Sequence, residues 1–189
     1  MDQNQAQSPQ KAPLLQFTLN VLEIVFASAC IVFLIFFFVA RLSFVSGTSM
    51  EHTLSNGDRV ITSRLLYEPA AGDIVVIHKT GDTYNDMIIK RIIATEGQYV
   101  KIEPHGVYVS DDAIFDESEL LDESAYAYVS GGFIRYASGQ VYAVPEGHVF
   151  VLGDNRNNSK DSRDPDIGTI DERCIMGRVI FRLPTSNAD

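Results

Sequence analysis

No charged side chain occurs in the 17 residues IVFASACIVFLIFFFVA, Ile24 to Ala40, and the sequence SGTSM follows within ten residues, at Ser46–Met50. Extended back to Val21, the apolar segment has 20 residues and would span about 30 Å as a helix, enough to cross the hydrocarbon core of a bilayer. Only Glu23 interrupts it, close to the end, where a carboxylate can reach the interface. The sequence therefore predicts a transmembrane anchor at residues 21–40, with a serine-containing turn a short distance outside the membrane.

The flanks of the anchor argue against a cleaved signal peptide. A signal peptide has a basic segment followed by an apolar core of about 7–15 residues. Here only Lys11 is basic, the core is longer, and Arg41 follows it directly. Residues 1–20, rich in Gln and Ala, are predicted to be a disordered tail. With one basic residue on each side, charge alone leaves the orientation of the anchor open.

The composition limits the class of protein. The chain has 189 residues and a formal net charge of -10. This length allows the anchor and one domain of roughly 145 residues, and the acidity argues against a nucleic-acid-binding surface, which needs basic patches. Seven of the thirteen residues from Asp111 to Glu123 are acidic, which indicates a solvated acidic loop or, alternatively, a cation site. Cys30 lies inside the apolar segment and Cys174 near the C-terminus, so neither a disulfide nor a zinc site is expected.

Residues 41–189 are predicted to form an antiparallel β domain with a variable acidic insert at about 111–140. Short runs rich in Val, Ile, Tyr and Phe alternate apolar and polar residues between Gly, Asp and Asn, and only Met50–Leu54 favours one or two helical turns. The predicted strands are Asp58–Ser63, Asp73–His78, Met87–Ala94, Tyr99–Glu103, Gly106–Ser110, Phe133–Tyr136, His148–Leu152 and Gly177–Leu183. The fold class is therefore mainly β, with an N-terminal transmembrane helix followed by an antiparallel β-sheet domain.

Ser49 is a candidate nucleophile if a base lies nearby, because a serine hydroxyl is only weakly nucleophilic at neutral pH. None of the four histidines has an aspartate at a suggestive spacing, so a histidine-dependent mechanism stays open without specific support. Lys90 is the better candidate, because on a strand it shares an apolar face with Ile88, Ile92 and Ala94.

Burial on such a face would turn Lys90 into a base. An ammonium group without water around it has a lowered pKa, and a decrease from about 10.4 to about 8 needs about 3 kcal/mol. The neutral amine could then accept the proton of Ser49. The alternative is that the side chain of Lys90 extends past the isoleucines and keeps its charge in water.

A third polar block, GDNRNNSKDSR at Gly153–Arg163, follows the apolar strand His148–Leu152. One interpretation is an EF-hand-like loop, although Lys160 occupies the glycine position and no glutamate closes the loop. A solvated polar turn is another interpretation of the same residues.

In this order, the blocks resemble those of bacterial type I signal peptidases, in particular Gram-positive-like members with a single N-terminal span. The resemblance covers roughly Phe44–Pro184, and its specificity comes from the order of the blocks, since each one alone is weak evidence. The matching segments are Ser46–Leu54 for the nucleophile, Gly72–Val76 for a strand, Ile89–Ile93 for the general base, Gly153–Arg163 for the last block, and Ile167–Gly168 and Gly177–Val179 after it.

The resemblance implies a membrane-bound serine endopeptidase with Ser49 as nucleophile and Lys90 as general base, and with no metal or other cofactor. The backbone N–H of Ser49 would help to form the oxyanion hole. Gly47 stands where some relatives have a hydroxyl donor, so backbone donors or a water would complete the hole. Ser159 would hydrogen-bond to the amine of Lys90 and orient it. The residues that would shape the site without reacting are Met50, Asp154, Asn155, Arg156, and the ion pair of Asp161 and Arg163.

The implied substrates are secreted preproteins, which the family cleaves after small residues at -1 and -3 through an acyl-enzyme. An extended substrate could add itself to exposed strand edges, for which Val45–Thr48 and Asp73–His78 are the candidates. The candidate walls of the shallow side-chain pockets are Val45, Leu54, Ile88 and Ile89.

The resemblance also implies a location in the cell membrane, with a cytoplasmic N-terminus, an extracytoplasmic catalytic domain, and lipid and the translocation machinery nearby. Tyr126–Tyr136 is either an aromatic patch on the lipid interface or an ordinary pair of core strands. Two departures from the family are His52 in place of proline and Gly97-Gln98 in place of Gly-Asp. A histidine three residues from Ser49 would add a pH dependence in the range where histidines titrate.

Three other classes of protein share part of the pattern. A Ser-Lys autoprotease of the repressor-cleavage type would be soluble and would carry a helix-turn-helix in place of the anchor. An ER-type signal peptidase would have histidine in place of Lys90. A catalytically silent, membrane-anchored binding protein would keep its function in Ser49→Ala, whereas the peptidase would lose it.

Overall fold

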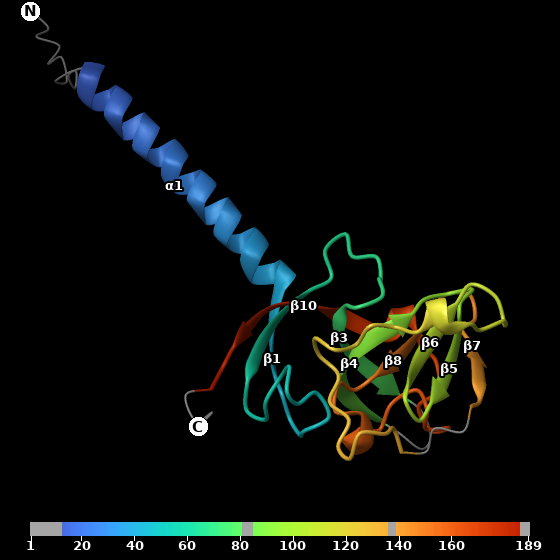
Figure 1. The fold of residues 1–189 in the computed structure, drawn as a ribbon. Coiled ribbons are helices and arrows are strands. Elements are labelled where there is room, and N and C mark those ends of the chain that lie inside the picture. The colour runs from blue at the N-terminus through green and yellow to red at the C-terminus, as the bar shows by residue number, and fades with distance from the viewer. Residues whose placement is uncertain (1–12, 81–84, 136–138, 186–189) are drawn as a thin grey trace, which may run out of the picture. The chain divides into compact units, whose positions relative to one another are not determined.

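The computed structural model describes residues 13–80, 85–135 and 139–185, which fall into two compact units, residues 1–39 and 40–189 (Figure 1). The described part of the first unit is helix α1, Pro13–Val39, which begins with proline, a residue favoured in the first helical turn. The 22 residues Pro13–Leu34 are strongly apolar, and their most apolar stretch is not buried by the rest of the protein. Helix α1 is thus long and apolar enough to cross a membrane.

Helix α1 begins earlier than the charge-free sequence suggests. The prediction of disorder is wrong for residues 13–20, which form its first turns. The polar residue Thr18 fits into the helix because its hydroxyl donates to the carbonyl of Leu15, one turn earlier, at 2.9 Å. The remainder of the predicted tail, residues 1–12, lies outside the described residues.

The second unit contains two antiparallel sheets, as predicted for the domain (Figure 1). The larger sheet has seven strands in the order β1-β2-β10-β3-β4-β8-β9, and the smaller has three in the order β6-β5-β7. The strands are β1 Ala40–Phe44, β2 Arg59–Ser63, β3 Ile74–Thr80, β4 Asn85–Ala94, β5 Tyr99–Glu103, β6 Gly106–Ser110, β7 Val141–Ala143, β8 His148–Leu152, β9 Ile170–Asp171 and β10 Ile175–Leu183. Short 3₁₀ helices occur at η1 Glu117–Glu119, η2 Arg156–Asn158 and η3 Glu172–Cys174.

Seven of the eight predicted strands are present, each with ends within two residues of the prediction. The exception is Phe133–Tyr136, whose last residue lies outside the described residues. Gly131 and Gly132 precede it with φ of 85° and 76° and turn the chain, and the N–H of Ile134 donates to the carbonyl of Pro104. The sequence did not predict β1, β7 and β9.

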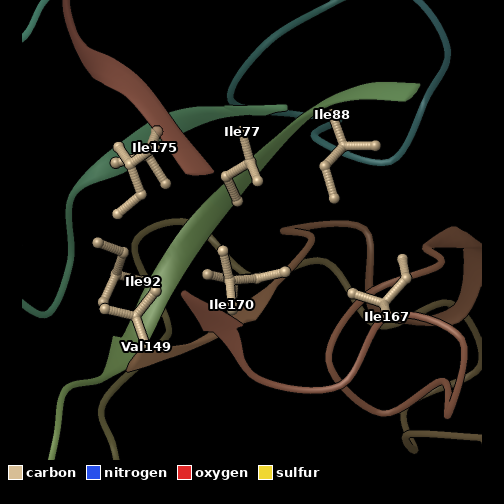
Figure 2. Packing of buried hydrophobic residues seen from close by; sticks show 9 residues of the cluster. Ile77, Ile88, Ile92, Val149, Ile167, Ile170 and Ile175 are labelled. Carbon is tan, nitrogen blue, oxygen red and sulfur yellow. The ribbon is translucent and has the colours of Figure 1, made fainter. Parts of the chain in front are cut away.

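Strand β4 contributes to all three apolar clusters of the domain, which fixes its position from both faces. Ile88 and Ile92 belong to the first cluster, in which isoleucines and valines of β3, β4, β8, β9 and β10 converge (Figure 2). Ile93 and Ala94 belong to the second, next to the smaller sheet, and Ile89 packs against the third. The expected face of Ile88, Ile92 and Ala94 is interrupted, because a register shift between Ile92 and Ala94 carries Ala94 into the second cluster.

Candidate active site

Ser49 lies in the turn between β1 and β2, and the residues on either side of it are fixed by packing. Met50 and Leu54 are each only 2% exposed and belong to the third cluster. The N–H of Leu54 donates to the carbonyl of Met50 at 2.8 Å, so Met50–Leu54 forms a hydrogen-bonded turn in place of the predicted helical turns. Gly47 has a φ of 88°, which favours glycine, and its N–H donates to the side-chain oxygen of Asn56. The turn therefore holds Ser49 on a rigid base.

Lys90, on β4, reaches the hydroxyl of Ser49. Its Nζ lies 2.7 Å from Ser49 Oγ and also donates to the carbonyl of Ile89 at 2.9 Å. Lys90 is 3% exposed, and among the described residues it makes no ion pair. Burial lowers the pKa of Lys90 from 10.5 to about 8, although the negative charges of Asp161 and Asp154 offset part of the effect. A substantial fraction of this amine is therefore neutral at mildly alkaline pH, as a base for Ser49 requires.

Arg91, the next residue of β4, is buried with a carboxylate. Its Nε and Nη2 donate to the two oxygens of Asp154 at 2.8 and 2.7 Å, and its Nη1 donates to the carbonyl of Gly72. The guanidinium carbon also lies 4.0 Å from the centre of the Tyr126 ring. Asp154, which is fully buried, accepts a further hydrogen bond from the hydroxyl of Thr53. This pair joins β4 to the loop after β8 and to the nucleophile turn.

The loop Gly153–Arg163 presses directly against the nucleophile. The N–H of Asn155 donates to the carbonyl of Ser49 at 3.0 Å, and its side-chain amide donates to the carbonyl of Thr48 at 3.1 Å. At Gly153, a Cβ atom would lie 2.5 Å from the carbonyl oxygen of Ser49 and 2.2 Å from Ser159 Oγ. Only glycine allows this approach, so Gly153 is required by space.

Two further ion pairs stabilise the loop Gly153–Arg163. Arg156 is 1% exposed, donates from Nε to the carbonyl of Gly153, and pairs through both Nη atoms with the carboxylate of Glu123. Asp161 forms the predicted pair with Arg163, at 2.7 Å from its Nε, and also accepts from the N–H of Gly153. No role was predicted for Glu123. Its signal was weak, because the residue is one of seven acids in a short segment.

The predicted hydrogen bond between Ser159 and Lys90 is not present. The hydroxyl of Ser159 is buried and has no hydrogen-bond partner among the described residues. Ser159 Oγ instead lies against Gly153, 2.2 Å from the place where a Cβ atom of this residue would be. The amine of Lys90 is instead held by the carbonyl of Ile89.

A pocket of about 310 Å³ opens beside the Ser49 hydroxyl, between the nucleophile turn and the start of β4. Val45, Ile88 and Ile89 line it, as expected, but Leu54 does not. The lining residues are Phe44, Val45, Ser46, Gly47, Thr48, Ser49, Met50, Asp86, Met87, Ile88, Ile89, Lys90, Asn158 and Lys160.

Neither of the two segments predicted as strand edges for an extended ligand is an edge of the sheet, since β3 is an interior strand and Val45–Thr48 follows β1 without strand structure. Strand β3, which includes most of Asp73–His78, is an interior strand between β10 and β4, so this candidate edge is wrong. The segment Val45–Thr48 does line the pocket. The opposite wall is the first half of β4, because β8 pairs with β4 only from Arg91 onward. Residues 85–90 pair with β3 along one edge, so an extended peptide meets open backbone groups there only along the opposite edge.

The acidic segment is partly structured and partly packed on the site. Among the described residues, no group of three His, Cys, Asp or Glu side chains is arranged to hold a metal ion. Asp116 caps η1 by accepting from the N–H of Ser118. The described residues of Tyr126–Tyr136 form no pair of core strands. Ile134 is buried in the second cluster and Tyr128 contacts His52 edge to face at 4.5 Å, whereas Phe133 is half exposed.

Comparisons with known proteins agree on one family. The family model described as signal peptidase, peptidase S26, matches residues 18–184. The probable signal peptidase I-1 of Synechocystis sp. is 32% identical over 185 residues, covering 93% of this chain and 87% of the relative. Signal peptidase IB of Staphylococcus aureus is 34% identical, covering 82% and 86%. The solved structure of a signal peptidase I from Enterococcus faecalis V583 aligns at a TM-score of 0.41 and 22% identity, over 60% of this chain and 97% of that one.

Proposed function

The chain belongs to the signal peptidase family, peptidase S26, and from this membership we propose that it removes signal peptides from exported preproteins with Ser49 as nucleophile and Lys90 as general base. One observation carries the assignment of the residues: a buried amine without an ion pair among the described residues lies 2.7 Å from a serine hydroxyl at the wall of a pocket. Lysine in this state can accept a proton, whereas a solvated lysine cannot do so near neutral pH.

Catalysis would proceed through an acyl-enzyme. The neutral amine of Lys90 takes the proton of Ser49 Oγ as this oxygen bonds to the carbonyl carbon of the scissile peptide. The protonated amine then gives that proton to the leaving nitrogen, and the peptide bond breaks. In the second half, Lys90 takes a proton from water, the resulting hydroxide attacks the ester, and Ser49 recovers its proton as the signal peptide leaves.

The pocket supports a substrate in extended conformation with small side chains. Residues 85–90 of β4 offer unpaired backbone groups on one side, and Val45–Thr48 offer the other. Val45, Ile88 and Ile89 contribute apolar patches to a lining that is otherwise largely polar, and such patches suit alanine at -1 and -3. We expect larger side chains at these two positions to be rejected.

Helix α1 would anchor the enzyme in the membrane, with the N-terminus in the cytoplasm and the catalytic domain on the extracytoplasmic face. A preprotein near the translocation machinery is held in the same bilayer by its own apolar segment. Confining both partners to one membrane raises their effective concentration, so a shallow pocket suffices for recognition.

The test is cleavage of a preprotein by the full chain in detergent or lipid, comparing wild type with Ser49→Ala and Lys90→Ala. We expect both variants to lose cleavage by roughly a thousandfold or more. The wild-type rate should rise tenfold per pH unit up to about pH 8, where Lys90 becomes neutral. Equal cleavage by all three proteins would overturn the assignment, and a retained cellular function in Ser49→Ala would favour a catalytically silent binding protein.

A further inference from the structure

We propose that the hydroxyl of Thr48, held in place by Asn158, is a second hydrogen-bond donor to the oxyanion that forms when Ser49 attacks its substrate. The first donor is the backbone N–H of Ser49. This inference rests on the proposed function, and it assigns a catalytic role to a residue that the sequence did not single out.

The need for a second donor follows from the chemistry of acyl transfer. The carbonyl oxygen of the substrate becomes an oxyanion, and preorganised donors that stabilise it are often the largest single contribution to the rate. The N–H of Gly47 cannot serve, because it donates to the side chain of Asn56 at 3.0 Å. Gly47 has no hydroxyl either, so a second donor from the protein would be another residue at the pocket.

The N–H of Ser49 is oriented by Asn155. The carbonyl of Thr48 accepts from the side-chain amide of Asn155 at 3.1 Å, and the peptide between Thr48 and Ser49 is trans. In a trans peptide the C=O and N–H point in opposite directions, so the N–H of Ser49 points away from Asn155. Among the described residues it has no acceptor, which leaves it available to a substrate.

Thr48 carries the second donor. Asn158 donates from its side-chain nitrogen to Thr48 Oγ1 at 2.6 Å. A hydroxyl has one hydrogen to donate and two lone pairs to accept with, so a threonine that accepts from Asn158 keeps its own hydrogen for another acceptor. That hydrogen has no acceptor among the described residues. Thr48 and Asn158 line the same pocket as Ser49 and Lys90.

One rigid loop fixes both donors. Asn155 is the N-cap of η2, and Asn158, three residues later, is its last residue. Between them, Arg156 is buried and paired with Glu123. Asn155 therefore sets the N–H of Ser49 while Asn158 sets the hydroxyl of Thr48, and neither donor needs to reorganise during the reaction.

The test compares Thr48→Val, which keeps the shape and removes the hydroxyl, with Thr48→Ser, which keeps the hydroxyl. Steady-state kinetics of the full chain in detergent, with a signal-peptide substrate ending in alanine, give kcat and KM separately. We expect Thr48→Val to lower kcat by about 10- to 100-fold with KM unchanged within twofold, since an oxyanion contact exists only in the transition state. Thr48→Ser should stay within about threefold of wild type, and the matched control Thr169→Val, outside the pocket, should be unaffected.

Asn158→Ala separates positioning from catalysis. It should lower kcat by less than Thr48→Val does, and adding it to Thr48→Val should cost nothing more, because Asn158 acts only through the hydroxyl. The midpoint of the pH profile should be unchanged in all variants. An unchanged kcat in Thr48→Val, a rise in KM alone, or a Thr48→Ser variant as slow as Thr48→Val would overturn the proposal. In each Thr48 or Asn158 variant, adding Ser49→Ala should abolish the cleavage that remains. That result would support the proposed function even where the role of Thr48 is overturned.

Discussion

Lys90 and Arg91 are consecutive residues of one strand and are both buried, yet their charges are treated in opposite ways. Lys90 is 3% exposed, touches Ser49, and has no ion-pair partner among the described residues. Arg91 is 9% exposed and meets the carboxylate of Asp154 through two hydrogen bonds. Alternation along the strand sends the two side chains to opposite faces.

The difference shows how a protein obtains a base and a support from the same kind of residue. Desolvation without a partner disfavours the ammonium form and leaves an amine that can take a proton. Desolvation with a bidentate partner keeps the guanidinium charged and fixed in place. Stability is therefore given up at Lys90 for chemistry, whereas Arg91 and Asp154 hold the strand against the loop that carries Asn155.

The largest effect on cleavage should come from removing the amine of Lys90. Lys90→Met keeps the length of the side chain and removes the charge, so cleavage should fall by about a thousandfold while the protein becomes more stable. Below pH 8 both the folded and unfolded states hold the lysine proton, and folding bears the full desolvation cost of about 3 kcal/mol. Chemical unfolding at pH 7, followed by tyrosine fluorescence, measures the gain.

The sign of this effect with pH is a further check on the same variant. Between about pH 8 and 10.5 the unfolded chain binds the proton and the folded chain does not, so wild-type stability rises and the advantage of methionine shrinks. A difference in stability that stays constant from pH 7 to 10 would show that Lys90 is not desolvated.

A substitution in the pair of Arg91 and Asp154, on the other face of β4, should lower the stability of the domain, whereas Lys90→Met should raise it. Asp154→Asn leaves Arg91 buried without its counter-charge, which should destabilise the domain by about 3 kcal/mol. Cleavage should also fall, because Asp154 accepts from Thr53 and belongs to the loop that positions the Ser49 turn. Asp171→Asn, at an exposed pair with Arg173, is the matched control and should change stability by less than about 0.5 kcal/mol. Equal effects of the two substitutions would contradict the role assigned to burial.

The smallest effect should come from His52, which contacts neither side chain of this comparison and packs against Tyr128. His52→Pro should change the cleavage rate by less than about threefold, because the imidazole packs on Tyr128. Rates of wild type and variant from pH 5 to 9 give the answer. Superimposable profiles would exclude His52 from the pH dependence of the enzyme.

The parts of the molecule that followed from the sequence are those whose cause is local. Alternation predicted most strands and placed Lys90 on an isoleucine face, but it left open whether the amine is buried or extends into water. Strand β1 was missed because its apolar residues continue those of the anchor, and β9 because two residues show no period. The position of Ser159 and the pairing of Glu123 with Arg156 depend on how closely two distant loops approach. No spacing in the sequence encodes that approach.

The place of β10 in the larger sheet has a consequence for synthesis. Ser49 lies between β1 and β2 and Lys90 on β4, and within the sheet β10 is the strand that joins β2 to β3. A ribosome makes residues 175–183 after all the other strands of the sheet, so the backbone link between β2 and β3 is the last part of the sheet that can form. Before that, the Ser49 turn and β4 meet only through side-chain and loop contacts such as those of Asp154 and Asn155.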